Sequence, residues 1–194
     1  MTVSKVGQTK SAQCCVWLFA TVIDNYGDAG VAWRLAQALR HEEDMQVCLW
    51  LDDWAALRPL CPDLTEEDGQ CLHWVRLFRW QAHSLPESLL LAPEADAVLE
   101  LFACDLPPEV LARMLLSRPL WLNVEYLSAE AWVDDVHLLP SLQGNGLAKY
   151  FYCPGFGPRT GGVLRPASGQ LCPVSDSGGA ACCPSGQRGC PGGG

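Results

Sequence analysis

The chain has 194 residues, 49% of them hydrophobic, and a formal net charge of −9. This apolar content is enough for a core of ordinary size, which excludes a chain that is disordered throughout. The negative charge argues against nucleic acid or an anionic membrane as the main partner, because both require clusters of Lys and Arg that neutralise phosphate. It fits a basic protein partner, although acidity also serves simply to keep a chain soluble.

The amino terminus has no features of a targeting or membrane-spanning segment. Residues 1–12 are polar, and we expect them to be flexible. They lack the long apolar stretch of a signal peptide, and the apolar run from Cys14 to Ile23 is too short to cross a bilayer. We therefore predict a cytoplasmic protein. The eleven cysteines show neither a CxxC pair nor the His/Cys spacing of a zinc site, so no metal is predicted.

Apolar runs alternate with helical periodicity in the first part of the chain. Cys15–Ile23 is a continuous apolar run, typical of a strand that is buried on both faces. The loop Asp24–Gly30 follows, and residues 31–40 then carry apolar side chains at helical spacing. Met45–Leu51 predicts a second strand, and Trp54–Leu60 predicts a short helix.

The alternation continues in the second part of the chain. Leu72–Phe78 predicts a third strand, Ala95–Ala103 a fourth and Leu120–Tyr126 a fifth. Residues 107–117 predict a helix with prolines in its first turn, and Ser128 is placed to cap a further short helix. Strands that alternate with helices indicate βαβ units, so we expect an α/β, Rossmann-like fold with a doubly wound parallel sheet.

The composition changes abruptly after Arg165. Residues 166–194 contain eight Gly, four Pro and four Cys, but no Ile, Phe, Trp or Tyr. Such a segment cannot bury enough surface to offset the entropy of ordering it. We therefore expect one domain over residues 13–165. We interpret residues 166–194 as a disordered tail that is translated from a shifted reading frame.

Ligands of doubly wound sheets bind outside the carboxyl ends of the strands. The loop Asp24–Gly30 is the most informative segment there, because its backbone N–H groups are expected to face an anion site at the helix start. It lacks both the GxGxxG pattern of dinucleotide sites and the Gly-Lys-Ser/Thr of a P-loop. On pattern alone, Asp28 is more often a helix cap than a catalytic acid. The other polar residues at this edge are Asp52, Asp53, Cys104, Asp105 and Glu125.

Five longer segments follow one another over residues 15–165: ATVIDNYGDAGVAWRLAQAL, VCLWLDDWAALRPLCPDL, VLELFACDLPPEVL, PLWLNVEYLSAEAWVDDVHLLPS and KYFYCPGFGPRTGGVLR. Together they resemble the elongation factor P arginine rhamnosyltransferases, the EarP family. The resemblance implies the amino-terminal half of a GT-B glycosyltransferase fold. It also implies that this half binds elongation factor P, while a carboxyl-terminal domain holds most of the donor, dTDP-β-L-rhamnose.

The implied reaction is the transfer of L-rhamnose to an arginine of elongation factor P, with inversion. In the DNYGD-like motif the resemblance makes Asp28 the general base and Asp24 a second catalytic residue, and it places Asn25, Tyr26, Gly27 and Asp28 against the donor. A carboxylate suits a guanidinium acceptor, since it pairs with the planar fork and draws off a proton as the C–N bond forms. No cofactor is implied beyond the donor substrate.

Members of this family are about twice as long as the present chain, in line with two domains of ordinary size. We therefore expect a truncated chain that is inactive alone. An inactive fragment that only binds elongation factor P is the alternative, and a nucleotide-binding α/β module is a third interpretation. The roles of Glu100, Asp105 and Glu125 stay open, because such residues are more often caps or ion pairs than functional groups.

Overall fold

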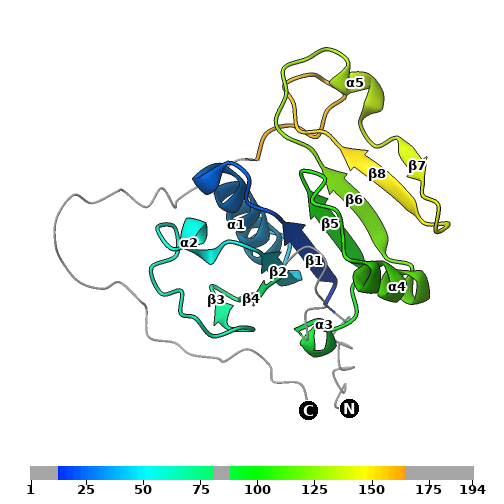
Figure 1. The fold of residues 1–194 in the computed structure, drawn as a ribbon. Helices are drawn as coiled ribbons and strands as arrows, with labels where there is room; N and C mark the ends of the chain where they lie inside the picture. The colour runs from blue at the N-terminus through cyan, green and yellow to red at the C-terminus, as the bar shows by residue number, and fades with distance from the viewer. Residues whose placement is uncertain (1–12, 81–87, 165–194) are drawn as a thin grey trace, which may run out of the picture.

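The computed structural model describes residues 13–80 and 88–164 (Figure 1). The predictions for residues 1–12 and 166–194, a flexible amino terminus and a disordered tail, lie outside the described residues. The domain limits of 13–165 therefore stay a prediction, and the described residues show the architecture between them.

Eight strands form one sheet in the order β3-β4-β2-β1-β5-β6-β8-β7 (Figure 1). The inner strands, from β4 to β8 in this order, pair in parallel, and the edge strands β3 and β7 are antiparallel to their neighbours. This confirms the α/β, doubly wound parallel sheet that the sequence predicts. The strands are β1 (Cys15–Ala20), β2 (Gln46–Leu51), β3 (Cys71–Leu72), β4 (Val75–Arg79), β5 (Ala97–Leu101), β6 (Leu120–Val124), β7 (Pro140–Leu142) and β8 (Ala148–Tyr152).

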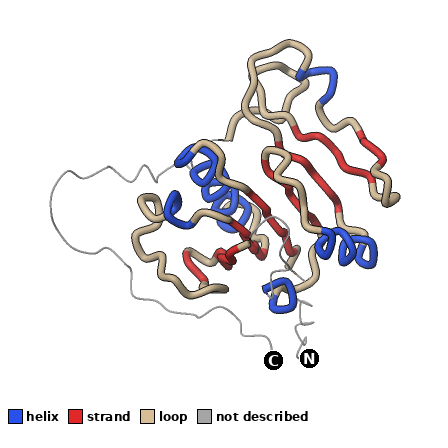
Figure 2. Tube along the Cα trace, viewed as in Figure 1, coloured by secondary structure: helices blue, strands red, loops and turns tan. Residues whose placement is uncertain are grey.

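Helices lie on both faces of the sheet (Figure 2). Residues of α1 and α2 form one apolar cluster with alternate side chains of β1, and residues of α3 and α4 form a second cluster with the other side chains of β1. Successive side chains of a strand point to opposite faces, so β1 has to be apolar at every position. The helices are α1 (Asn25–His41), α2 (Trp54–Leu57), α3 (Ser88–Leu91), α4 (Pro108–Ser117) and α5 (Val133–Val136).

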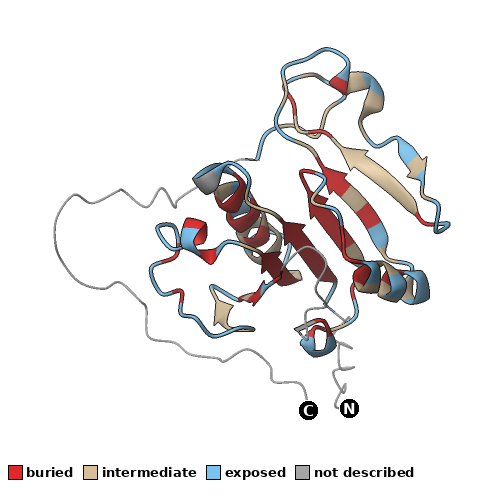
Figure 3. Cartoon of the chain, viewed as in Figure 1, coloured by how far each residue is buried: buried red, intermediate tan, exposed pale blue. Residues whose placement is uncertain are grey.

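The central strands are the most deeply buried part of the sheet (Figure 3). A row of aromatic rings crosses β1, β2 and β4 on the face that α4 covers. The ring of Trp50 stacks on Phe19 on one side, with centroids 4.7 Å apart, and on Phe78 on the other, with centroids 5.0 Å apart. Such pairs contribute roughly 0.5–1.5 kcal/mol each beyond the area that they bury.

The helix after β1 begins earlier than the sequence indicates. We predicted a loop over Asp24–Gly30, but α1 begins at Asn25, and the backbone N–H of Gly27 donates to the carbonyl of Asp24 at 2.8 Å. The glycines suggested a loop, but they lie in the helix, and a Cβ on Gly30 would make only an ordinary contact, 3.5 Å from a methyl group of Leu60. The segment that was expected to be a loop therefore forms the first turns of α1.

Two other predictions were wrong. Leu72–Phe78 is not one strand but a hairpin of β3 and β4, which turns at His73 and Trp74 with φ values of +48° and +64°. Ser128 does not begin a helix: its hydroxyl accepts the backbone N–H of Glu130 at 3.1 Å, and α5 begins only at Val133. The strands β7 and β8 had not been predicted.

Candidate active site

The candidate site lies where the strand order reverses. From β1 the chain builds β2 and β4 on one side of β1, and it then crosses to form β5 on the other side (Figure 1). The segments that follow β1 and β5 therefore diverge at the carboxyl ends of two neighbouring strands. Open α/β sheets bind their ligands in the crevice at such a switch point.

Asp28 is a buried carboxylate at this point, with an exposed fraction of 2%. It belongs to the first turn of α1. Its Oδ2 accepts the backbone N–H of Ile23 at 2.8 Å and that of Asp24 at 2.9 Å, and its Oδ1 accepts the hydroxyl of Tyr126 at 3.0 Å. The N-cap residue is therefore Asp24 and not Asp28, which instead reaches back from the first turn to accept two N–H groups just before the helix.

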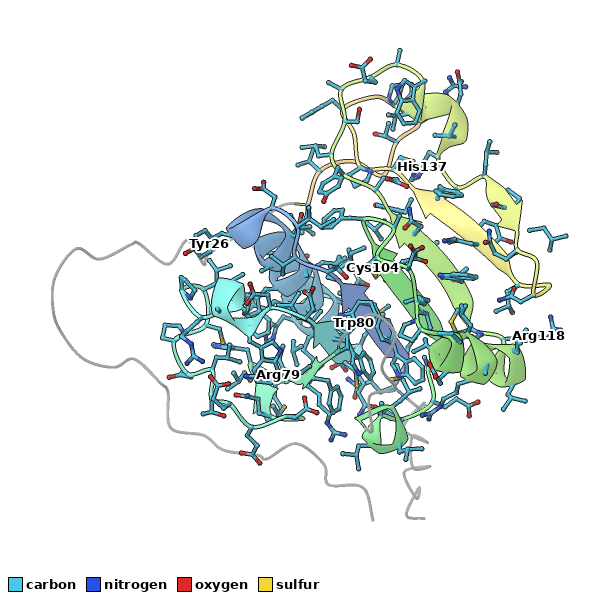
Figure 4. All side chains as sticks on the ribbon, in the orientation of Figure 1. Tyr26, Arg79, Trp80, Cys104, Arg118 and His137 are labelled. Carbon is cyan, nitrogen blue, oxygen red and sulfur yellow. The ribbon has the colours of Figure 1, made fainter. Side chains whose placement is uncertain are left out.

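The rest of the DNYGD-like motif lies at the start of α1. Asp24 is the N-cap residue, but its side chain makes no capping hydrogen bond and is exposed. Tyr26 is also exposed, at 62% (Figure 4). A Cβ on Gly27 would lie 3.3 Å from Asp24 Oδ2, so the glycine leaves room for that carboxylate. Asn25 is in the helix, and its side chain lies outside the described part of the chain.

Asp52 and Asp53 have structural partners at the same edge. Asp52 Oδ1 accepts the backbone N–H groups of Val22 at 2.9 Å and Asp53 at 2.8 Å, which ties the end of β1 to the end of β2. Asp53 caps α2, since its Oδ1 accepts the backbone N–H of Ala55 at 2.8 Å. Both carboxylates are therefore used in local structure.

The segment after β5 has an unusual backbone. Phe102, Ala103 and Asp105 have φ values of +57°, +52° and +52°, a left-handed conformation that costs a non-glycine residue roughly 1–2 kcal/mol. The backbone N–H of Phe102 donates to the carbonyl of Val124 at 2.9 Å, and that of Ala103 donates to Asn123 Oδ1 at 3.0 Å. Strain of this kind tends to persist where the surroundings fix it, often at functional sites.

An aromatic pair connects this strained segment to Asp28. The ring of Phe102 is stacked on Tyr126, with centroids 4.0 Å apart and planes 6° apart. Tyr126 is half exposed. Partial burial raises its pKa, and the hydrogen bond to Asp28 and the charges of Asp28, Asp24 and Glu125 raise it further. Phe102 and Tyr126 were not predicted as site residues. Their one sequence signal was their position at the carboxyl ends of two predicted strands.

Glu100 and Glu125 have different surroundings. Glu100 is buried, and its Oε2 lies 3.1 Å from Lys149 Nζ and accepts the indole N–H of Trp121 at 3.1 Å. It is therefore a structural ion pair. Glu125 Oε1 accepts a hydrogen bond from Asn123 Nδ2.

Asp105 and Cys104 add no reactive pair to the site. Asp105 is exposed, and it does not cap the following helix, because the N-cap residue of α4 is Pro107. The thiol of Cys104 donates to the carbonyl of Phe19 at 3.4 Å, between β1 and β5 (Figure 4). Burial, with the charge of Glu100, raises the pKa of Cys104, so the thiol stays protonated at neutral pH and is a poor nucleophile.

Three further features bear on other functions. Within residues 13–80 and 88–164, no group of three His, Cys, Asp or Glu side chains is placed to hold a metal ion. In the same part of the chain, no helix is long and apolar enough to cross a membrane. A shallow depression lined by Glu94–Asp96 and by 117–119 lies where β5 and β6 begin, at the end of these strands opposite to the candidate site.

Comparison with known proteins supplies the family. Residues 16–170 match the family described as Elongation-Factor P (EF-P) rhamnosyltransferase EarP. The chain is 49% identical over 150 residues to a protein-arginine rhamnosyltransferase of Neisseria meningitidis serogroup B (strain H44/76), a match that covers 77% of the chain and 38% of the relative. It is also 49% identical over 155 residues to that of Pseudomonas putida, and 46% identical over 153 residues to that of Pseudomonas aeruginosa.

These two matches cover 78% and 77% of the chain, but only 40% and 39% of the relatives. The chain thus spans about two fifths of the length of the curated relatives that it matches. The matched residues include the DNYGD-like motif and every strand of the sheet except Cys15, the first residue of β1. The chain belongs to the EarP family of elongation factor P rhamnosyltransferases.

Proposed function

We propose that this chain is the acceptor-side, amino-terminal domain of a protein-arginine rhamnosyltransferase. The whole enzyme would transfer L-rhamnose from dTDP-β-L-rhamnose to an arginine of elongation factor P, with inversion at the sugar. Family membership supports the class of reaction. The observation that carries the proposal is the fixed, buried carboxylate of Asp28 at the switch point, beside the exposed carboxylate of Asp24.

In this proposal Asp28 is the general base. A carboxylate offers about four acceptor positions, and Asp28 uses three of them for Ile23, Asp24 and Tyr126. One position remains for an N–H of the acceptor guanidinium. As the nitrogen attacks the anomeric carbon, the bond from that carbon to the phosphate oxygen breaks, dTDP leaves, and the nitrogen passes its proton to Asp28. Attack from the face opposite the leaving group gives inversion.

The acceptor is a difficult nucleophile, because free guanidinium has a pKa above about 12 and a delocalised charge. Two carboxylates would stabilise the positive charge of the guanidinium and accept its proton. Asp24, which is exposed and free of a capping bond, is placed to pair with the cation as it arrives. Asp28 then accepts the proton, which becomes acidic as the new C–N bond forms. A Ser–His–Asp arrangement would not stabilise a cationic acceptor in this way.

The donor would meet the first turn of α1, which holds Asn25, Tyr26, Gly27 and Asp28. The exposed ring of Tyr26 is available for such a contact. These residues offer only a small part of a nucleotide-sugar site. Because the chain spans about two fifths of its relatives, we assign most donor contacts to the remainder of the enzyme. The cytoplasmic location stays a prediction.

A chain that only binds elongation factor P is the weaker alternative, since the relatives are named as transferases. We nevertheless expect the chain alone to be inactive. Holding donor and acceptor in register is worth up to about 7–11 kcal/mol, whereas each hydrogen bond to a single helix start gives a net of about 1 kcal/mol. The first turn of α1 therefore cannot hold the donor well enough for turnover.

The experiment measures the intact mass of elongation factor P after incubation with dTDP-β-L-rhamnose and enzyme. The enzyme is either the chain alone or a hybrid transferase, in which residues 13–164 replace the matching segment of the Pseudomonas putida relative. We expect a gain of one deoxyhexose with the hybrid and none with the chain alone. A hybrid that binds elongation factor P but adds no sugar would contradict the proposed function, and turnover by the chain alone would contradict the donor argument.

A further inference from the structure

Tyr126 and Asp28 lie 98 positions apart in the sequence, and they meet across the sheet. Tyr126 follows β6, whereas Asp28 belongs to α1, which follows β1, and β5 lies between those two strands. The Tyr126 hydroxyl nevertheless donates to Asp28 Oδ1 at 3.0 Å. It is the one side-chain donor to this carboxylate among the described residues, and the other two donors are backbone N–H groups.

The position of the Tyr126 ring is fixed from a second direction. Phe102, which is buried, stacks on it almost in parallel. Phe102 itself has a left-handed backbone and donates its N–H to the carbonyl of Val124, two residues before Tyr126. The left-handed conformation is unfavourable for every residue except glycine, yet Phe102 retains it, and the ring of Phe102 orients Tyr126.

The hydrogen-bond donors of Asp28 are divided between its two carboxylate oxygens, and this division affects how Asp28 can act as a base. The N–H groups of Ile23 and Asp24 both donate to Oδ2, so among the described residues only Tyr126 donates to Oδ1. The two oxygens of a planar carboxylate move together about the Cβ–Cγ bond, and a donor on each of them restrains that rotation more than donors on Oδ2 alone. The Tyr126 hydroxyl fixes Oδ1, and with it the direction of the remaining acceptor position. Small errors in the direction of a reacting group cost large factors in rate.

We propose that Tyr126 is a positioning residue for the reaction: its hydroxyl, oriented by the stack on Phe102, holds Asp28 Oδ1 in the direction that proton transfer requires. This inference rests on the proposed function, in which Asp28 is the base. The competing interpretation is that Tyr126 only packs on Phe102 and satisfies a buried acceptor. In that case its loss would change stability without changing the chemical step.

The first test uses the chain as it is and follows tyrosine ionisation by its ultraviolet absorbance as the pH is raised. Partial burial and the neighbouring Asp28 raise the pKa of Tyr126, so this tyrosine should ionise at higher pH than a tyrosine free in solution. Asp28→Asn removes the charge and should lower that ionisation midpoint, while Tyr126→Phe should remove the transition altogether. A midpoint that Asp28→Asn leaves unchanged would overturn the inference.

The matched control for this titration is Tyr152→Phe. The Tyr152 hydroxyl donates to the carbonyl of Gly161 at 2.7 Å, so this variant also loses one phenol hydrogen bond, but not one to Asp28. We expect the high-pH transition of Tyr126 to survive in it. If that transition is lost in Tyr152→Phe, it belongs to Tyr152 and not to Tyr126, and the inference loses its support.

The second test measures turnover in the hybrid transferase. Tyr126→Phe should lower kcat about tenfold, less than the roughly 10²–10⁴ that loss of the base itself costs, because Asp28 remains, and it should leave KM for elongation factor P within about twofold. Tyr152→Phe should retain the kcat of the parent. A Tyr126→Phe variant with the parental kcat would overturn the inference alone. A parent hybrid that transfers no sugar would instead contradict the proposed function, so the two failures are distinguishable.

Discussion

Asp28 Oδ2 accepts the backbone N–H of Ile23 at 2.8 Å, across the junction between the strand β1 and the helix α1. The same oxygen accepts the N–H of Asp24 at 2.9 Å. One carboxylate therefore fixes the junction and, in the proposed function, also takes the proton of the acceptor. The two roles make different demands on the side chain, so substitutions at this position can separate them.

Asp28→Asn should remove catalysis and retain the fold. Asparagine keeps an oxygen that can accept the N–H groups of Ile23 and Asp24. It cannot take a proton from a guanidinium, so kcat of the hybrid transferase should fall by about 10²–10⁴. Turnover and thermal unfolding, measured on the same preparation, check both halves of the prediction. An asparagine variant that works at full rate would end the catalytic assignment.

Asp28→Ala should destabilise the chain itself. It leaves the N–H groups of Ile23 and Asp24 and the hydroxyl of Tyr126 without their acceptor. Orphaned groups of this kind cost about 1–3 kcal/mol of unfolding free energy, which urea denaturation measures. Asp24→Ala is the matched control, because that side chain makes no capping bond, and its effect should stay within about 0.5 kcal/mol. Equal losses in the two variants would show that Asp28 is not the residue that holds the junction.

Lys149→Met should be among the most destabilising single changes in the sheet. It leaves the buried carboxylate of Glu100, which lies 3.1 Å from Lys149 Nζ, without its cationic partner. Breaking a buried pair from one side typically costs about 3–5 kcal/mol. The double variant Glu100→Gln with Lys149→Met removes the stranded charge and should recover most of this loss in urea denaturation. If the two effects simply add, the ion pair does not form in solution.

Glycine should relieve backbone strain at two positions with left-handed conformations. Arg118 is the C-cap residue of α4 with φ +49°, and Ala103 has φ +52°. Either residue changed to glycine should gain up to about 1 kcal/mol of unfolding free energy, because the left-handed penalty exceeds the entropy that glycine loses. In the hybrid transferase, Arg118→Gly should leave kcat unchanged, whereas Ala103→Gly should lower it by loosening the segment next to Phe102. Destabilisation by both glycines would mean that these conformations are not strained.

The central strands were predictable because burial on both faces leaves no freedom in their composition. All six residues of β1 are buried and apolar, and the sequence shows the same run. The edge hairpin of β7 and β8 was missed for the opposite reason. Its residues are half-buried or exposed, so neither an apolar run nor a strict alternation marks them. The start of α1 was missed because Gly27 and Gly30 are typical of loops.

The candidate site was only partly predictable. Asp24 and Asp28 lie in one motif, which the family resemblance identifies. Their partner Tyr126 lies 98 positions from Asp28, and the partner of Glu100 is Lys149, 49 positions away. No local pattern links residues at such separations, because the order of strands in the sheet brings them together. A sequence therefore yields the carboxylates at the switch point, and the fold is needed to identify which of them are already paired.

The central claim is that this domain recognises the protein acceptor. Its most direct test is a calorimetric titration of the chain with purified elongation factor P, with dTDP titrated separately as the comparison ligand. We predict saturable binding of elongation factor P and weak or undetectable binding of the free nucleotide. Saturable binding of dTDP without any binding of elongation factor P would contradict the account, and it would indicate a nucleotide-binding α/β module instead.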